Sequence, residues 1–157
     1  MSDILGPSNK RFVFRTISPG DPLPRPFGDG RGFVCLIWDN QGGVADSNRE
    51  RLATSLIAAG CRYAVCAGFE CEVWHDAVDL AFLAQGLSEE EQDRRFVMTT
   101  WHDGESEDDV AFFFVLNTQH PEEEFDDYLV LQIGSDPQRE ARLRKLIMEY
   151  ARGTEAA

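Results

Sequence analysis

The chain alternates between short apolar runs and longer stretches in which apolar residues recur every three or four positions. Runs of the first kind are typical of strands, and the segment 33–38 is apolar throughout, as in strands covered on both faces. Five strands are predicted, at 11–17, 33–38, 62–67, 96–101 and 128–133, and the strand at 96–101 is expected to be buried. Helices are predicted at 47–59, 71–85, 110–116 and from Asp136 onwards, with an acidic connector or short helix at 88–93.

Two of these helices have recognisable start signals. Ser47 and Glu50 have the spacing of a capping box, in which the side chains at the two ends bond each other's backbone. Ser106 and Asp109 have a similar spacing just before the run 110–116. That run is apolar enough to be a fully buried strand instead. We favour a helix, because the next clear strand needs a crossover connection before it.

The order of elements predicts the fold class. Strands that alternate with helices of this length indicate an α/β fold, here a single three-layer domain with a mainly parallel sheet of four to five strands and helices on both faces. The segment 18–30 has four prolines between positions 19 and 26, so we expect an extended surface loop. The single domain, 1–157, is therefore divided into an N-terminal strand and Pro-rich loop at 10–31 and a β–α repeat core at 32–152.

Composition places the chain among globular proteins. With 157 residues, 43% of them hydrophobic, it is long and apolar enough to bury a core. No apolar run approaches the roughly 20 residues of a membrane span, and residues 1–10 lack the pattern of a signal peptide. Cys61 and Cys66 bracket a strand too short to fold back and pair them. Free thiols and a cytoplasmic location are therefore expected.

The acidic residues are unevenly distributed along the chain. The formal net charge is −13, and the window 88–127 contributes 2 − 14 = −12 of it. Such a charge repels phosphate backbones and anionic lipids, so we expect no direct binding of nucleic acid or membranes. A basic protein partner would fit, although a solvated acidic face is the plainer interpretation. The candidate partner-binding residues are Glu122, Glu123, Glu124, Asp126 and Asp127. Residues 139–152 carry a charge of +3, which leaves self-association possible.

Polar residues with possible chemistry follow the predicted strands. In an open α/β sheet, ligands bind beyond the carboxyl ends of the strands. The candidates there are Asp39, Glu70, His75, His102 and Asp103. If the Trp-His-Asp segments at 74–76 and 101–103 converge, their histidines could exchange protons or bind a metal. Cys71 lies four residues before His75, so Cys71, His75 and His102 are weak metal candidates. A hydrogen-bonded histidine at the core edge and an ordinary Asp-Gly turn explain the same residues.

The glycine loop after the strand at 33–38 is a second candidate site. Gly42, Gly43, Ser47 and Arg49 precede or open a helix, where backbone N–H groups could cradle a phosphate. The spacing matches neither the dinucleotide-binding pattern nor the Walker pattern, and Asp39 and Asp46 would repel an anion. An ordinary loop explains these residues equally well. We therefore predict no bound cofactor.

The two Trp-His-Asp segments, with their surroundings at 71–82 and 97–114, resemble small bacterial α/β proteins of uncharacterised function. The resemblance implies no activity. Two hypotheses for the function follow from the residues themselves. The favoured one is a binding or regulatory module that engages a protein partner, because the acidity is concentrated and no complete catalytic motif is present. The alternative is a small hydrolase-type enzyme or ligand-binding protein with a pocket at the strand ends.

Overall fold

Six strands form one sheet in the order β1-β2-β6-β3-β4-β5. The computed structural model describes residues 4–5, 10–25, 27–28 and 31–156. The strands are β1 (Ile4–Leu5), β2 (Arg11–Ile17), β3 (Phe33–Asp39), β4 (Cys61–Gly68), β5 (Met98–Trp101) and β6 (Asp127–Ile133), and the helices are α1 (Asp46–Ala59), α2 (Cys71–Leu83), α3 (Glu89–Arg95), α4 (Glu107–Leu116) and α5 (Pro137–Ala156). Strands β2 to β6 are parallel, and β1 pairs antiparallel with β2. The predicted α/β fold is confirmed.

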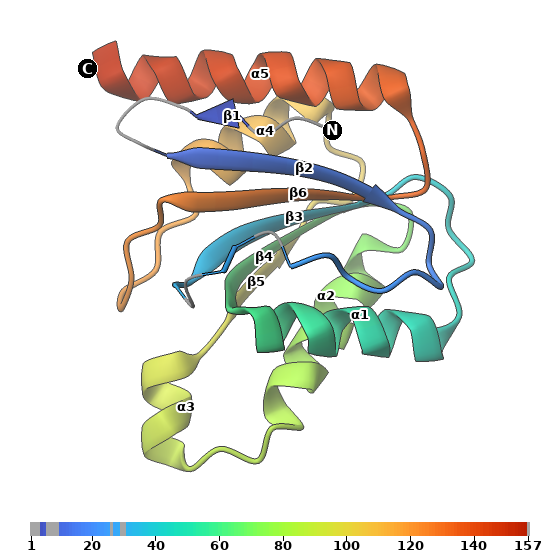
Figure 1. The fold of residues 1–157 in the computed structure, drawn as a ribbon, viewed down its shortest axis with the longest axis vertical. Helices are drawn as coiled ribbons and strands as arrows, with labels where there is room; N and C mark the ends of the chain where they lie inside the picture. The colour runs from blue at the N-terminus through green and yellow to red at the C-terminus, as the bar shows by residue number, and fades with distance from the viewer. Residues whose placement is uncertain (1–3, 6–9, 26, 29–30, 157) are drawn as a thin grey trace.

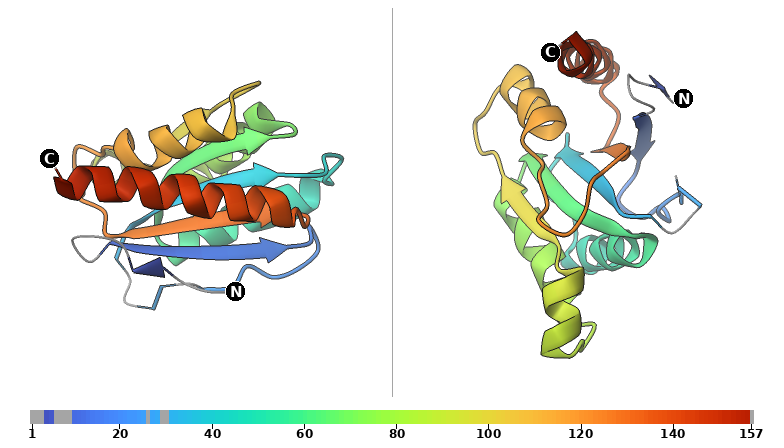
Figure 2. Two further views of the ribbon diagram at one scale, coloured as in Figure 1. Left: turned by 90° about the horizontal axis from the view of Figure 1, so that it is seen from above. Right: turned by 90° about the vertical axis from the view of Figure 1, so that its left-hand side faces the viewer.

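The helices cover both faces of the sheet, as Figures 1 and 2 show. Helices α1 and α2 pack on one face, against inward residues such as Cys35 and Ile37 of β3. Helices α4 and α5 pack on the other, against Val34 and Leu36 of the same strand. Alternate residues of β3 thus enter two separate cores, and all seven of its residues are buried. This explains why the sequence of β3 is continuously apolar.

The chain order changes direction at one place in the sheet. From β3 the chain moves outward through β4 to the edge strand β5, and then α4 brings it back to β6 on the other side of β3. All five parallel strands therefore direct their carboxyl ends to one end of the molecule, with their amino ends at the opposite end (Figure 1). The loops that carry the predicted chemistry lie together at the carboxyl end.

Two details of the predicted elements are wrong. Helix α1 begins one residue before Ser47, and its N-cap, Ala45, makes no side-chain capping bond, so Ser47 and Glu50 are not a capping box. The strand expected at 96–101 is the four-residue β5, which is half-buried and ends on an exposed Trp101. It is not fully buried, because it lies at the sheet edge and pairs with β4 alone among the described strands.

Other expectations are confirmed. The run 110–116 is helical, and the Ser106 side chain accepts a hydrogen bond from the N–H of Asp109, as its spacing predicted. The acidic segment forms the short helix α3. The four cysteines are free and buried, and burial raises the pKa of the Cys61 thiol to about 12. None of the helices in the described part of the chain combines the length and apolar character of a membrane span.

Candidate functional site

A hollow of 390 Å³ lies at the carboxyl ends of β3, β4 and β5. We call it the carboxyl-end hollow. The structure brings four of the five predicted site residues to its wall, namely Asp39, Glu70, His102 and Asp103. They come from three different strand ends, which is the arrangement expected where parallel strands end side by side. What the hollow can do depends on which of these groups are still free to meet a ligand.

Asp39 is completely buried and all its hydrogen-bonding capacity is directed inward. Its Oδ2 accepts a hydrogen bond of 2.9 Å from the indole N–H of Trp74. Its Oδ1 accepts from the backbone N–H groups of Gln41, at 3.0 Å, and Gly42, at 2.9 Å. One carboxylate thus joins β3, the following loop and helix α2. Asp39 is held as a structural clamp by three hydrogen bonds from the protein.

Glu70 is occupied in the same way. Its Oε2 is 2.7 Å from Nη2 of Arg49, and its Oε1 accepts a hydrogen bond from the N–H of Gly43. The Glu70 backbone has a φ of 54°, in the left-handed region, which costs about 1–2 kcal/mol for a residue other than glycine. The side-chain bonds to Arg49 and Gly43 hold Glu70 in this position and offset part of that strain.

The predicted phosphate cradle is filled by these same carboxylates. The N–H groups of Gly42 and Gly43 donate to Asp39 and Glu70, so an incoming anion would have to displace a protein carboxylate. Arg49 is buried and donates to Asp46, Glu70 and the carbonyl of Val44. Ser47 is exposed on the first turn of α1. In the glycine loop, the N–H groups that could bind a phosphate are therefore already bonded to carboxylates of the protein itself.

His102 is buried at the edge of the hollow with both ring nitrogens engaged. Its Nδ1 lies 3.0 Å from a carboxylate oxygen of Glu105 and its Nε2 lies 2.9 Å from the hydroxyl of Thr100. A carboxylate only accepts, so Nδ1–H donates to Glu105, and Nε2 of the neutral ring accepts from Thr100. The ring also packs against Phe113 of α4. Its neighbour Asp103 is exposed on the wall of the hollow.

The two Trp-His-Asp segments contact each other through His75 and Trp101, but their two histidines do not come together. His75 lies on α2, where it bonds Asp76 and packs edge-to-face against Trp101 with ring centroids 4.6 Å apart. Trp101 and His102 are consecutive residues at a strand end, so their side chains point to opposite faces of the sheet. Cys71 is buried, and the described residues contain no group of three or more histidine, cysteine or acidic side chains placed to hold a metal.

Sequence reasoning missed three residues of this site. Glu105 lines the hollow and orients His102, while Thr100 completes the chain of hydrogen bonds. Arg139 of α5 also lines it, stacks over Trp38 and bonds the side-chain oxygen of Asn40 at 2.5 Å. Glu105 lies three residues after His102, a spacing that could have suggested the contact. No local pattern connects Arg139 to Asn40, because the two are 99 positions apart.

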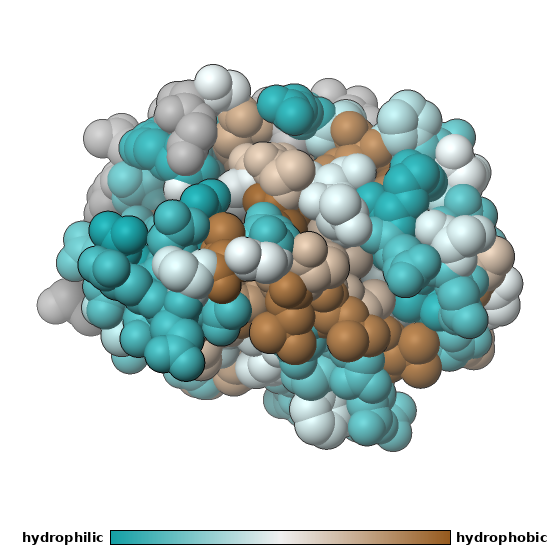
Figure 3. All heavy atoms as spheres, turned by 90° about the horizontal axis from the view of Figure 1, so that it is seen from below, coloured by the Kyte–Doolittle hydropathy of each residue, from teal (hydrophilic) through white to brown (hydrophobic). Residues whose placement is uncertain are grey.

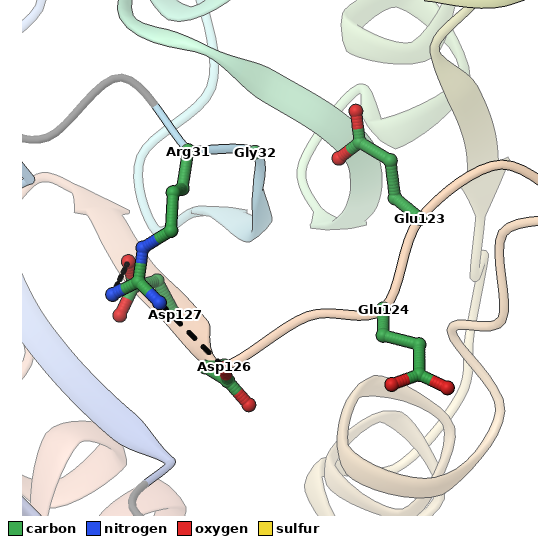
Figure 4. Close-up of a pocket in the computed structure, with 6 residues that line it drawn as sticks. All are labelled: Arg31, Gly32, Glu123, Glu124, Asp126 and Asp127. Carbon is green, nitrogen blue, oxygen red and sulfur yellow. Dashed lines mark ion pairs between the residues drawn. The ribbon is translucent and has the colours of Figure 1, made fainter.

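A second hollow, of 340 Å³, lies at the opposite end of the sheet. We call it the amino-end hollow. Figure 4 shows Arg31 and Gly32 on one side, facing Glu123 and Glu124 across it, with Asp126 and Asp127 beside Arg31. Four of the five predicted partner-binding residues line it.

These acidic residues are engaged to different degrees. Asp127 is buried and accepts a hydrogen bond from Nε of Arg11, with Arg31 3.6 Å from its other oxygen. Glu123 lies 3.4 Å from Nε of Arg62 and is partly buried. Glu122, Glu124 and Asp126 are exposed, although Asp126 also lies 3.7 Å from Arg31.

The acidic window of the sequence is divided between the two ends of the molecule. Residues 103–109 follow β5 at the carboxyl end, and α4 then carries the chain back to the amino end, where 122–127 and α3 lie. Three of the acids, Glu107, Asp108 and Asp109, form the first turn of α4, where they stabilise the helix. The single acidic window of the sequence thus forms two smaller acidic regions, one at each end of the molecule.

The comparisons with curated proteins and with solved structures gave no match. The sequence pattern of one family, described as a domain of unknown function (DUF7684), matches residues 13–149. The match runs from β2 to the last turns of α5 and includes both hollows. It extends over most of the chain, and the protein therefore belongs to the DUF7684 family.

Proposed function

We propose that this protein is a binding module that engages a basic segment of a protein partner at the amino-end hollow. The observation that carries the proposal is the state of Asp127. Asp127 lines the hollow and its side chain is 3% exposed, yet its buried Oδ2 accepts no hydrogen bond within the described part of the chain, although Nη2 of Arg31 lies 3.6 Å away. A buried acceptor without a donor is costly, at about 1–3 kcal/mol or more when charged. A lysine or arginine side chain entering the hollow would supply the donor.

The charge around the amino-end hollow also favours a basic segment as its ligand. Four carboxylates and one guanidinium line it, so the wall carries 1 − 4 = −3 charges. Glu124 and Asp126 are exposed and can meet a cation without first losing buried contacts. The nearby Glu122 extends the negative surface, which would speed the approach of a basic partner at low salt. A guanidinium that forms two hydrogen bonds suits adjacent carboxylates particularly well.

The carboxyl-end hollow gives catalysis little support, because its polar groups are already bonded within the protein. Asp39 and Glu70 have both carboxylate oxygens occupied, and His102 has both nitrogens occupied. A general acid or base needs a group that can reach the reacting atom. The four buried free thiols are also consistent with a reducing, cytoplasmic environment, which we include in the proposal.

The test is a titration with a nine-residue arginine–glycine peptide by isothermal calorimetry at two salt concentrations. Neutralising the hollow with E124Q and D126N should weaken binding at least tenfold. The matched control is E89Q with E90Q on α3, which removes the same charge from exposed positions outside the hollow. The control should change the affinity by no more than about twofold. Equal losses in both double variants would show diffuse attraction between opposite charges and would refute a site at Asp127.

A hydrolase at the carboxyl-end hollow is the second candidate, and one observation favours it. Thr100, His102 and Glu105 form a hydroxyl–imidazole–carboxylate chain with links of 2.9 and 3.0 Å, the order used to activate a nucleophile. Thr100 is not on the wall of the hollow, which ranks this candidate second. A fluorophosphonate probe followed by peptide mass spectrometry would test it. Labelling at Thr100 that H102Q abolishes would support a hydrolase, and an unlabelled Thr100 would remove it.

A further inference from the structure

We propose that the groove between α1 and α2 is a second docking site, and that its occupant is a basic amphipathic helix of a partner protein. The groove has a volume of 730 Å³, the largest of the hollows described above. It shares no lining residue with the amino-end hollow. Figure 3 views the molecule from the side of these two helices and shows hydrophobic residues gathered across the middle of the face.

The outer side of α2 carries an apolar stripe that its own fold does not bury. Helix α2 already buries Trp74 and Val78 against the sheet. On the groove side, Val73 is 43% exposed and Leu80 is 66% exposed. An exposed apolar stripe beside a buried one is unexpected for a helix that only covers a sheet, and such patches mark binding surfaces.

The spacing of the stripe is suited to another helix. Val73, Ala77, Leu80 and Ala84 line the groove at intervals of four, three and four residues, the pattern of a helix–helix seam. The alanines allow close approach of a second helix axis, at about 8–10 Å. The stripe covers about 17 Å along α2 at 1.5 Å per residue, which is three turns of a partner. Thr54 of α1 belongs to the opposite wall, so the groove is apolar on one side and polar on the other.

The rim of the groove selects the charge of the occupant. Its carboxylates point outward: the side chains of Asp46 and Asp76 are 95% and 63% exposed, and Glu50 is exposed. Its two arginines are drawn inward, since Arg49 is 5% exposed between Asp46 and Glu70, and Arg51 donates to the carbonyl of Pro19. A partner helix with lysine or arginine beside its apolar stripe fits this rim. The basic helix α5 of a second copy does not fit, because its apolar residues Leu143 and Ile147 are already buried in its own core. The net charge of −13 on each copy also opposes self-association.

The test uses an 18-residue helical peptide with leucines at helical spacing and lysines on its other faces, since shorter helices are marginal in water. The control peptide has the same composition in shuffled order. Fluorescence anisotropy should show binding of the helical peptide at least tenfold tighter than of the shuffled one. The variant V73N/L80N should lose at least tenfold in affinity. L83N is the matched control, because Leu83 is 58% exposed on the same helix but does not line the groove, and it should change affinity by less than twofold.

Three outcomes would overturn the proposal. The first is equal binding of the helical and shuffled peptides, and the second is equal loss in L83N and V73N/L80N. The third is a dimer in sedimentation of the free protein that V73N/L80N converts to a monomer, which would make the occupant a second copy. Because all substitutions are at exposed positions, circular dichroism should show unchanged folding. E124Q/D126N should bind the helical peptide like the wild type, so this proposal and the proposal for the amino-end hollow can fail separately.

Discussion

Replacing Asp39 should destabilise the protein strongly, and the size of the loss follows from its three hydrogen bonds. In Asp39→Asn the amide oxygen can still accept from Gln41 and Gly42, but the amide N–H group faces the indole N–H of Trp74. That change removes one hydrogen bond to a charged group, worth about 1.5–3 kcal/mol, and leaves the indole donor buried without a partner. We expect a loss of about 3 kcal/mol in the free energy of unfolding.

A double-mutant cycle isolates the contact between the carboxylate and the indole. Trp74→Phe removes the donor and leaves a small cavity, because Trp74 is 1% exposed. When both partners are replaced, the amide N–H introduced at position 39 still lacks a partner, but the indole donor and the charged oxygen that the single variants leave unmatched are both gone. The double variant should therefore be more stable than the sum of the single losses predicts. The expected coupling is about 1.5–3 kcal/mol. With a total stability of about 5–15 kcal/mol, all three variants should remain folded.

Urea unfolding followed by far-ultraviolet circular dichroism measures each variant without depending on tryptophan fluorescence. Linear extrapolation gives the free energy of unfolding in water, and equal slopes would show that the unfolded states are comparable. A coupling below about 0.5 kcal/mol would refute the reasoning, because Asp39 would then be stabilising something other than Trp74. It would also free Asp39 for chemistry in the carboxyl-end hollow.

Three further predictions follow from buried groups. Burial raises the pKa of all four thiols, so a disulfide reagent should react with the native protein far more slowly than with the urea-unfolded chain. The pKa of the Cys61 thiol rises from 9.0 to about 12 on folding, so the unfolded chain loses this proton at a lower pH than the folded protein. The free energy of unfolding should therefore fall between pH 9 and 12, by up to about 1.4 kcal/mol per pH unit for this thiol. Urea titrations across that range would measure the fall. Gly68→Ala should lower the free energy of unfolding by about 3 kcal/mol or more in the same assay, since a Cβ there would overlap the Asp39 carbonyl at a φ of 82°. The control Gly86→Ala should lower it by only about 1 kcal/mol, because the surroundings of Gly86 are open.

The fold was predictable because burial on both faces leaves a direct signal in a parallel strand. In β3 the apolar residues 33–38 alternate between the two cores, so the apolar run coincides with all of the strand except its last residue. In β5 the same kind of composition misled, because an edge strand is covered by a neighbour on one side only. Position in the sheet is a property of the topology, and no residue within β5 encodes it. The capping box predicted at Ser47 and Glu50 is wrong for a related reason, since the loop before α1 is held by Asp39 and Glu70 rather than by Ser47.

The sequence predicts where the candidate site lies, but not which of its side chains are already hydrogen-bonded within the protein. Asp39, Glu70, His102 and Asp103 were placed together by the rule that parallel strands end at one edge, and they do line one hollow. Their partners come from distant segments: Trp74 lies 35 positions from Asp39, and Arg49 lies 21 positions from Glu70. Whether a carboxylate is free or occupied therefore depends on contacts that periodicity and spacing do not describe. His75 was misplaced because helix α2 turns it to the opposite face of the sheet from His102.

The distribution of unsatisfied groups separates structural acids from those available for binding. At the carboxyl end, the N–H groups of Gly42 and Gly43 and the guanidinium of Arg49 would suit an anion, but Asp39 and Glu70 already occupy them. An external ligand gains little where the protein has completed its own hydrogen bonds. Of the three buried side-chain atoms without a hydrogen bond in the described part of the chain, two belong to Arg62 and Asp127 at the amino end. Glu123 lies 3.4 Å from Arg62, and Arg31 lies 3.6 Å from Asp127, so both residues have ion pairs but incomplete hydrogen bonding. A basic partner would supply the donor that Oδ2 of Asp127 lacks at that end, whereas Nη1 of Arg62 is itself a donor and needs an acceptor. The third unpaired atom, Nε of Arg49, lies at the carboxyl end.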